Sequence, residues 1–80
     1  MPYIKQTDRP RVLETLKAET EGELNFLITS IVKEYMNRKG LRYVTINEVL
    51  GVLDAVTREF YRRIAAPYED KKIQENGDVY

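Results

Sequence analysis

A long apolar stripe that leads to a proline constrains the fold of this chain most strongly. Large apolar side chains recur at intervals of three and four residues between positions 46 and 64, which is the spacing of one helix face. Pro67 has no backbone N–H and disfavours helical geometry at Ala66, so the helix should end or kink there. We therefore predict a helix over residues 46–65 as the central core element, with the stripe Ile46, Val49, Leu50, Leu53, Val56, Phe60 and Ile64.

The start of this helix has a capping-box pattern at residues 45–48. The Thr45 side chain would accept a hydrogen bond from the Glu48 amide, while the Glu48 carboxylate would reach back to the Thr45 amide. Val44 and Val49 stand where a hydrophobic staple would close over the box. The pattern therefore predicts Thr45 as the residue before the first helical turn.

A second helix is predicted over residues 21–39. Thr20 and Glu23 have the same capping-box spacing, and Gly40 is a typical helix stop. The connection of residues 41–44 to the next helix is short, so the two helices should be antiparallel neighbours.

Two shorter helices complete the expected fold. The first covers about residues 8–19, with Val12, Leu13 and Leu16 as its apolar face and Pro10 in its first turn. The last covers about residues 67–75, after the proline joint. The prediction is an all-α protein, a small bundle of three helices plus a short C-terminal helix, forming one domain over residues 1–80.

Composition excludes several classes of function. The 80 residues contain no cysteine and no histidine, which rules out disulfides, thiolate metal sites and imidazole chemistry. Thirteen basic residues balance thirteen acidic ones, so no net charge attracts a nucleic acid. No apolar run has the length to cross a membrane, and the first eleven residues lack the core of a signal peptide. We therefore expect a cytoplasmic protein with no membrane association.

The acidic residues do not form a pattern typical of a metal enzyme. All-helical nucleotide pyrophosphohydrolases bind magnesium through acids spaced by three on facing helices, and magnesium needs oxygen ligands converging on one site. In this chain only Glu75 and Asp78 have that spacing, and they lie in the tail around Gly77. The sequence therefore predicts a protein that is not an enzyme, with no metal site and no cofactor.

The long helix has a second face made of small residues. Gly51 and Ala55, four residues apart, lie away from the main stripe, and small side chains let another backbone approach closely. Another segment of the same chain would fill this face in one interpretation. In the other, the face mediates self-association, which stabilises small domains.

Arginine and tyrosine gather near the end of the same helix. Arg58, Arg62 and Arg63 lie beside Tyr61, and such a cluster could hold phosphates or single-stranded bases. Acidic residues stand four positions before Arg58 and Arg63, so ion pairs within the helix should neutralise most of this charge. Nucleic-acid or phosphate binding, with Lys71 and Lys72 added, is therefore the alternative function and not the favoured one.

The C-terminal tail adds aromatic residues to this surface. Tyr68 and Tyr80 are large enough to dock onto the bundle or onto a second chain, and a docked tail is expected. The candidate interaction surface consists of Gly51, Ala55, Arg58, Tyr61, Arg62, Tyr68 and Tyr80.

Three segments resemble a family of short uncharacterised bacterial and bacteriophage proteins. They are EGELNF at 21–26, NEVLGVL at 47–53 and EFYRRIAAPYEDKKIQENGDVY at 59–80. The resemblance implies that Tyr80 is a natural terminus, and it carries over no catalytic residue. The expected function is that of a small accessory or regulatory protein acting through protein contact, homo-oligomeric or bound to an unidentified protein partner.

Overall fold

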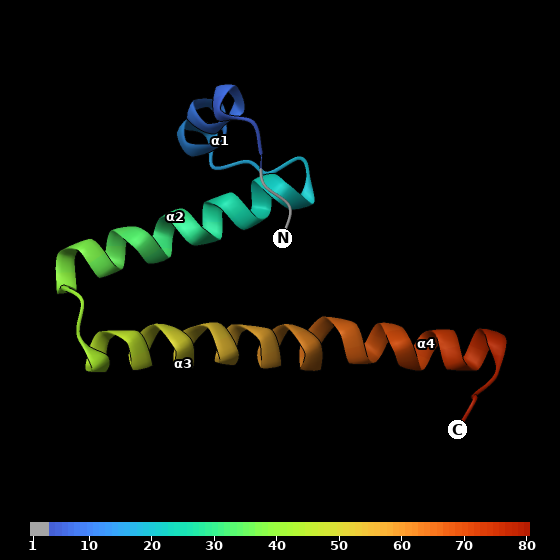
Figure 1. Cartoon of the computed structure of the whole chain (residues 1–80). Coiled ribbons are helices and arrows are strands. Elements are labelled where there is room, and N and C mark those ends of the chain that lie inside the picture. The colour runs from blue at the N-terminus through green and yellow to red at the C-terminus, as the bar shows by residue number, and fades with distance from the viewer. Residues whose placement is uncertain (1–3) are drawn as a thin grey trace. The chain divides into compact units, whose positions relative to one another are not determined.

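The computed structural model describes residues 4–80, and within this range the chain forms helices and no strands (Figure 1). This confirms the all-α class. The first three residues of the segment expected to lack a signal peptide lie outside the described range. The elements in chain order are the 3₁₀ helix η1 (Gln6–Asp8), α1 (Arg9–Thr15), α2 (Glu21–Lys39), α3 (Tyr43–Phe60), the π-helical segment η2 (Tyr61–Ala65) and α4 (Ala66–Asn76).

The chain separates into two compact units, and the boundary between them falls between Thr45 and Ile46, inside α3. The first unit contains η1, α1 and α2, and the second contains most of α3 with η2, α4 and the tail. The association of these helices as a three-helix bundle stays a prediction.

The first unit is built where α1 packs against α2. Val12 of α1 is fully buried, and among residues 4–80 Leu27 of α2 is the other buried large apolar residue. Leu13 and Leu16, which the sequence assigned to the same face as Val12, are exposed. Only one of the three residues predicted for the α1 face is therefore buried.

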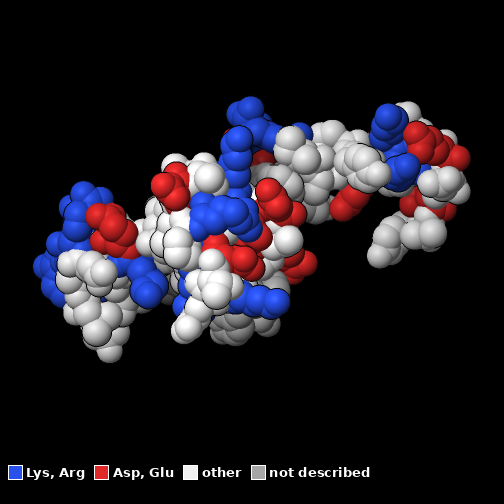
Figure 2. Space-filling view, turned by 90° about the horizontal axis from the view of Figure 1, so that it is seen from above, with Lys and Arg blue, Asp and Glu red and all other residues white. Residues whose placement is uncertain are grey.

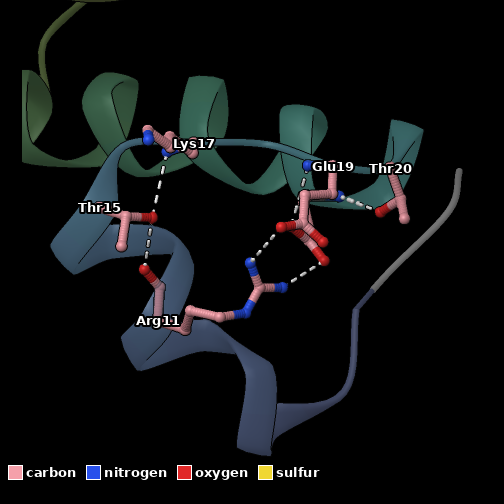
Figure 3. Close-up of polar contacts among 6 residues, drawn as sticks. Arg11, Thr15, Lys17, Glu19 and Thr20 are labelled. Atoms are coloured by element: carbon pink, nitrogen blue, oxygen red, sulfur yellow. Dashed lines mark hydrogen bonds and ion pairs between the residues drawn. The ribbon is translucent and has the colours of Figure 1, made fainter.

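An ion pair joins the two helices of this unit (Figure 3). Arg11 Nη2 lies 2.6 Å from Glu23 Oε2, while the other oxygen of Glu23 accepts a hydrogen bond from the Glu19 amide at 3.1 Å. The Glu23 side chain is 7% exposed, against 41% for Arg11. The bond from the Glu19 amide, followed by that from Arg11, lowers the pKa of the Glu23 carboxyl, because both stabilise its charged form.

The ends of α2 match the sequence prediction. Thr20 has an extended backbone and its Oγ1 accepts a hydrogen bond from the Glu23 amide at 3.1 Å, as an N-cap residue does. Gly40 ends the helix with a φ of 91°, a conformation that favours glycine. Glu23 completes the cap differently from a standard capping box, because its carboxylate binds the amide of Glu19 rather than that of Thr20.

The first helix is shorter than the predicted range of 8–19. It ends at Thr15, because Leu16 adopts the left-handed conformation, with φ 55° and ψ 27°, and donates its amide to the Val12 carbonyl. The turn of a helix C-terminus thus falls on leucine in place of the usual glycine. Apolar spacing alone did not reveal this early stop.

The capping box predicted at Thr45 is wrong, because α3 already begins at Tyr43. Thr45 lies inside the first helical turns and is fully buried, and its hydroxyl has no hydrogen-bond partner. A threonine followed three residues later by glutamate is compatible with a position within a helix as well as at its start.

The sequence left open whether the helix ends or kinks at Pro67, and the structure agrees with a kink. The chain continues from α3 through η2 into α4 as one long helix (Figure 1), and this helix is bent. Within η2 the Ala66 amide donates to the Tyr61 carbonyl, five residues back instead of four. A wider turn of this kind accommodates the proline, whose ring would clash with the carbonyl four residues earlier in a regular α-helix. The helix therefore continues through the proline, and the wide turn lies directly before it.

Candidate interaction surface

The second unit presents one long helical rod, and most of its apolar stripe is exposed. The rod covers Tyr43–Asn76, and its part from Ile46 onwards belongs to the second unit. At a rise of about 1.5 Å per residue, its length is about 51 Å. Phe60 is 62% exposed, and Leu50, Val56 and Ile64 are exposed to a similar degree. Among its described residues the unit contains no second helix beside the rod, so it cannot cover this stripe by itself.

The small-residue face lies on the opposite side of the rod. Positions 51, 55, 58 and 62 recur at helical spacing, so Gly51, Ala55, Arg58 and Arg62 share this face, and all four are exposed. A methyl group added at Gly51 would meet no atom within 4 Å, so there is room for another backbone at this position. Close approach by a partner helix is therefore sterically possible here.

The arginines of the rod are largely paired with acids of the same helix. Arg58 Nε lies 2.8 Å from Asp54 Oδ2, and Arg63 Nε lies 2.6 Å from Glu59 Oε1, both at a separation of four residues. Basic and acidic side chains are interspersed on the visible face in Figure 2. The expected ion pairs are therefore present, and they reduce the positive charge that a phosphate would meet.

Tyr61 makes a contact that the sequence did not indicate. Its hydroxyl donates a hydrogen bond to Glu69 Oε2 at 3.2 Å, across the π-helical segment. This bond raises the pKa of Tyr61, because loss of the proton would place a phenolate beside a carboxylate. The contact also shows that positions 61 and 69 share a side of the rod.

The aromatic residues of the C-terminal part lie apart from the small-residue face. Tyr68 is 60% exposed, and the Lys72 ammonium lies 5.4 Å from the centre of its ring. Val79 and Tyr80 are almost fully exposed, so the tail does not pack these side chains onto α4 as expected for docking within one chain. An open groove of about 380 Å³ lies between the tail and α4, lined by Tyr68, Glu69, Lys72, Ile73, Asn76, Gly77, Asp78, Val79 and Tyr80.

The structure thus divides the predicted surface into separate parts. Gly51, Ala55, Arg58 and Arg62 lie together on one face of the rod, whereas Tyr61 and Tyr68 lie on other sides. Tyr80 belongs to the tail. The widened turn at η2 moves the residues that follow it around the axis, and its presence was not foreseen from the sequence.

Two features are absent from residues 4–80: a metal-binding cluster and a membrane-spanning helix. No group of three or more acidic side chains in this range is placed to hold a metal ion. No helix in the same range combines the length and the apolar character that a membrane crossing requires.

A family model described as a domain of unknown function, DUF6899, matches residues 1–79. The chain belongs to this family. Neither the curated proteins nor the solved structures gave a match. DUF6899 membership leaves the function of the chain to be argued from the surface described above.

Proposed function

We propose that this DUF6899 protein is a non-enzymatic accessory or regulatory protein that acts through protein contact and self-associates. The observation that carries the proposal is the exposed apolar stripe on the rod of the second unit. A helix gains most of its stability in a protein from burying such a face, so an uncovered stripe favours association. A cytoplasmic location and a bacterial or bacteriophage origin are part of the same proposal.

The contact surface consists of the rod rather than of the arginines alone. Phosphate or nucleic-acid binding was the alternative, but Arg58 and Arg63 already have carboxylate partners within the helix. A ligand phosphate would have to displace those carboxylates. A partner that binds the apolar stripe would not have to displace these carboxylates.

Sedimentation equilibrium of the full chain at micromolar concentration tests the proposal. A mass that is a multiple of the 9.4 kDa chain supports self-association, and a strictly monomeric species contradicts it. The variant Phe60→Glu places a charge in the stripe and should shift the protein towards the monomer.

Leu41→Glu provides the matched control. Leu41 lies in the connection before α3 and is 82% exposed, so this substitution adds the same charge outside the stripe. The control should keep the oligomeric state of the unmodified chain. Equal dissociation of both variants would indicate an effect of net charge and would contradict the assignment of the stripe.

A further inference from the structure

Five apolar residues form a column along the rod with nearly symmetric spacing. Leu53 and Val56 precede Phe60 by seven and four residues, and Ile64 and Tyr68 follow it by four and eight. Four of the five are exposed to more than half, and Leu53 is half-buried. A patch that is symmetric about its centre is what a two-fold interface between identical chains requires, because each copy contributes the same surface.

The column extends seven residues before Phe60 and eight residues after it. The π-helical segment accounts for this difference of one residue. A turn with hydrogen bonds between residues i and i+5 contains one residue more than an α-helical turn. Eight residues across η2 therefore rotate about the helix axis by about the same angle as seven residues in α3. The hydrogen bond between Tyr61 and Glu69, also eight residues apart, supports this alignment. Tyr68 therefore falls in line with Phe60 instead of drifting around the axis.

The length of the elements indicates what can cover this column. Among the described residues, α2 is the only long helix of the first unit, and it has 19 residues. Its length is about 28 Å, whereas that of the rod is about 51 Å. A second copy of the rod has the same length as the first, so it can run along the whole column.

We infer that a second copy of this chain covers the column, with the two rods antiparallel and Phe60 at the two-fold axis. In this register Val56 of one copy packs against Ile64 of the other, and Leu53 packs against Tyr68. Phe60 lies in the centre, where aromatic anchors contribute most to binding. The inference rests on the proposed self-association and adds its orientation and register.

Charge placement along one edge of the column agrees with the antiparallel orientation. Glu59 and Arg63 lie on the same side of the rod, paired with each other at 2.6 Å. In an antiparallel pair this edge meets its own symmetry copy, so Glu59 of one chain approaches Arg63 of the other. Opposite charges then flank the central Phe60 contact.

Cysteine cross-linking tests the register, because the chain has no cysteine of its own to interfere. A disulfide requires Cα atoms about 4.4–6.8 Å apart. Val56 lies about 6 Å from the two-fold axis along the rod, so two copies of Val56 are about 12 Å apart in the inferred dimer. The variants Val56→Cys and Ile64→Cys should each fail to cross-link alone and should form a covalent dimer when mixed and oxidised.

Each other outcome overturns the inference in a recognisable way. Cross-linking of Val56→Cys with itself would indicate parallel rods or an antiparallel register centred on Val56, and efficient cross-linking of Ala55→Cys would assign the interface to the small-residue face. Either result would leave the proposed self-association intact. A chain that sediments as a monomer would remove both proposals.

Circular dichroism and sedimentation of each reduced variant provide the control for folding. Both cysteine variants should retain the helix content and the dimer mass of the unmodified chain. If the dimer persists and the mixture forms no cross-link, the inferred register is wrong. Phe60→Cys, which places the thiol at the axis, should then also fail to cross-link.

Discussion

The hydroxyl of Tyr61 donates a hydrogen bond to Glu69 Oε2 at 3.2 Å, joining the first residue of the π-helical segment to the first turns of α4. Eight residues separate the two, so the bond depends on the widened turn between them. It is both a contact within the rod and an indicator of the turn's geometry.

The variant Glu69→Gln should lower the pKa of Tyr61 towards its ordinary value. The raised pKa depends on the hydrogen bond to the carboxylate and on its negative charge, and the substitution removes the charge. Because the folded pKa is raised, the contact stabilises the fold below the ordinary tyrosine pKa and this contribution is lost as the pH rises through the folded value. NMR titration of the tyrosine ring carbons, with Tyr61→Phe for assignment, measures the shift.

The variant Pro67→Ala should convert η2 into regular α-helix. Alanine supplies an amide donor and removes the clash, which costs up to about 3 kcal/mol in a helix interior. The residues after η2 would then rotate about the axis, so Tyr61 and Glu69 would separate and the Tyr61 pKa would fall. An unchanged Tyr61 titration in this variant would show that the proline does not cause the wide turn.

Acid should weaken the first unit through Glu23. Its pKa is lowered in the folded chain, so its contribution to stability is present above the ordinary glutamate pKa and is lost as the pH falls through the folded value. Glu23→Gln should therefore be less stable at neutral pH and show a flatter decline towards acid. Urea unfolding from neutral pH to below pH 4.5 measures the difference.

Glu21→Gln serves as the control for the acid experiment. Glu21 lies in the same first turn of α2, and its side chain is exposed. This variant should follow the acid decline of the unmodified chain. If both variants flatten the curve equally, the helix N-terminus as a whole causes the effect, rather than the bonds of Glu23 to Arg11 and to the Glu19 amide.

Leu16→Gly should stabilise the chain by about 0.5–1 kcal/mol, because leucine in the left-handed region costs about 1–2 kcal/mol and glycine adopts it without strain. Leu16 is 70% exposed, so little packing is lost. Leu13→Gly, in the interior of α1, should have the opposite sign. Chemical denaturation measures the free energy of unfolding of both variants. Destabilisation by Leu16→Gly would contradict the presence of backbone strain at Leu16.

Short sequence motifs predicted a helix end correctly where a single residue determines that end. Thr20 and Gly40 predicted both ends of α2 because a cap and a stop act within a single turn. The start at Thr45 failed, since the same spacing fits the interior of a helix. The early end at Leu16 failed because leucine gives no sign of a left-handed turn.

The interaction surface was less predictable than the helices. Gly51, Ala55 and Arg58 follow regular spacing within α3, so the sequence could place them on one face. Tyr61, Arg62 and Tyr68 lie at or beyond the start of η2, where the number of residues per turn changes. Their positions around the rod therefore required the structure.

The extra residue in the wide turn leads to an expectation about other members of the DUF6899 family. Consider a relative that has one residue fewer between Phe60 and Tyr68 and no proline at the position of Pro67. Its chain would present the same apolar column on an uninterrupted α-helix. Loss of one residue and loss of the proline would thus compensate each other. Family members without a proline here should accordingly be one residue shorter over this interval, and sequencing of relatives can reveal whether the two changes occur together.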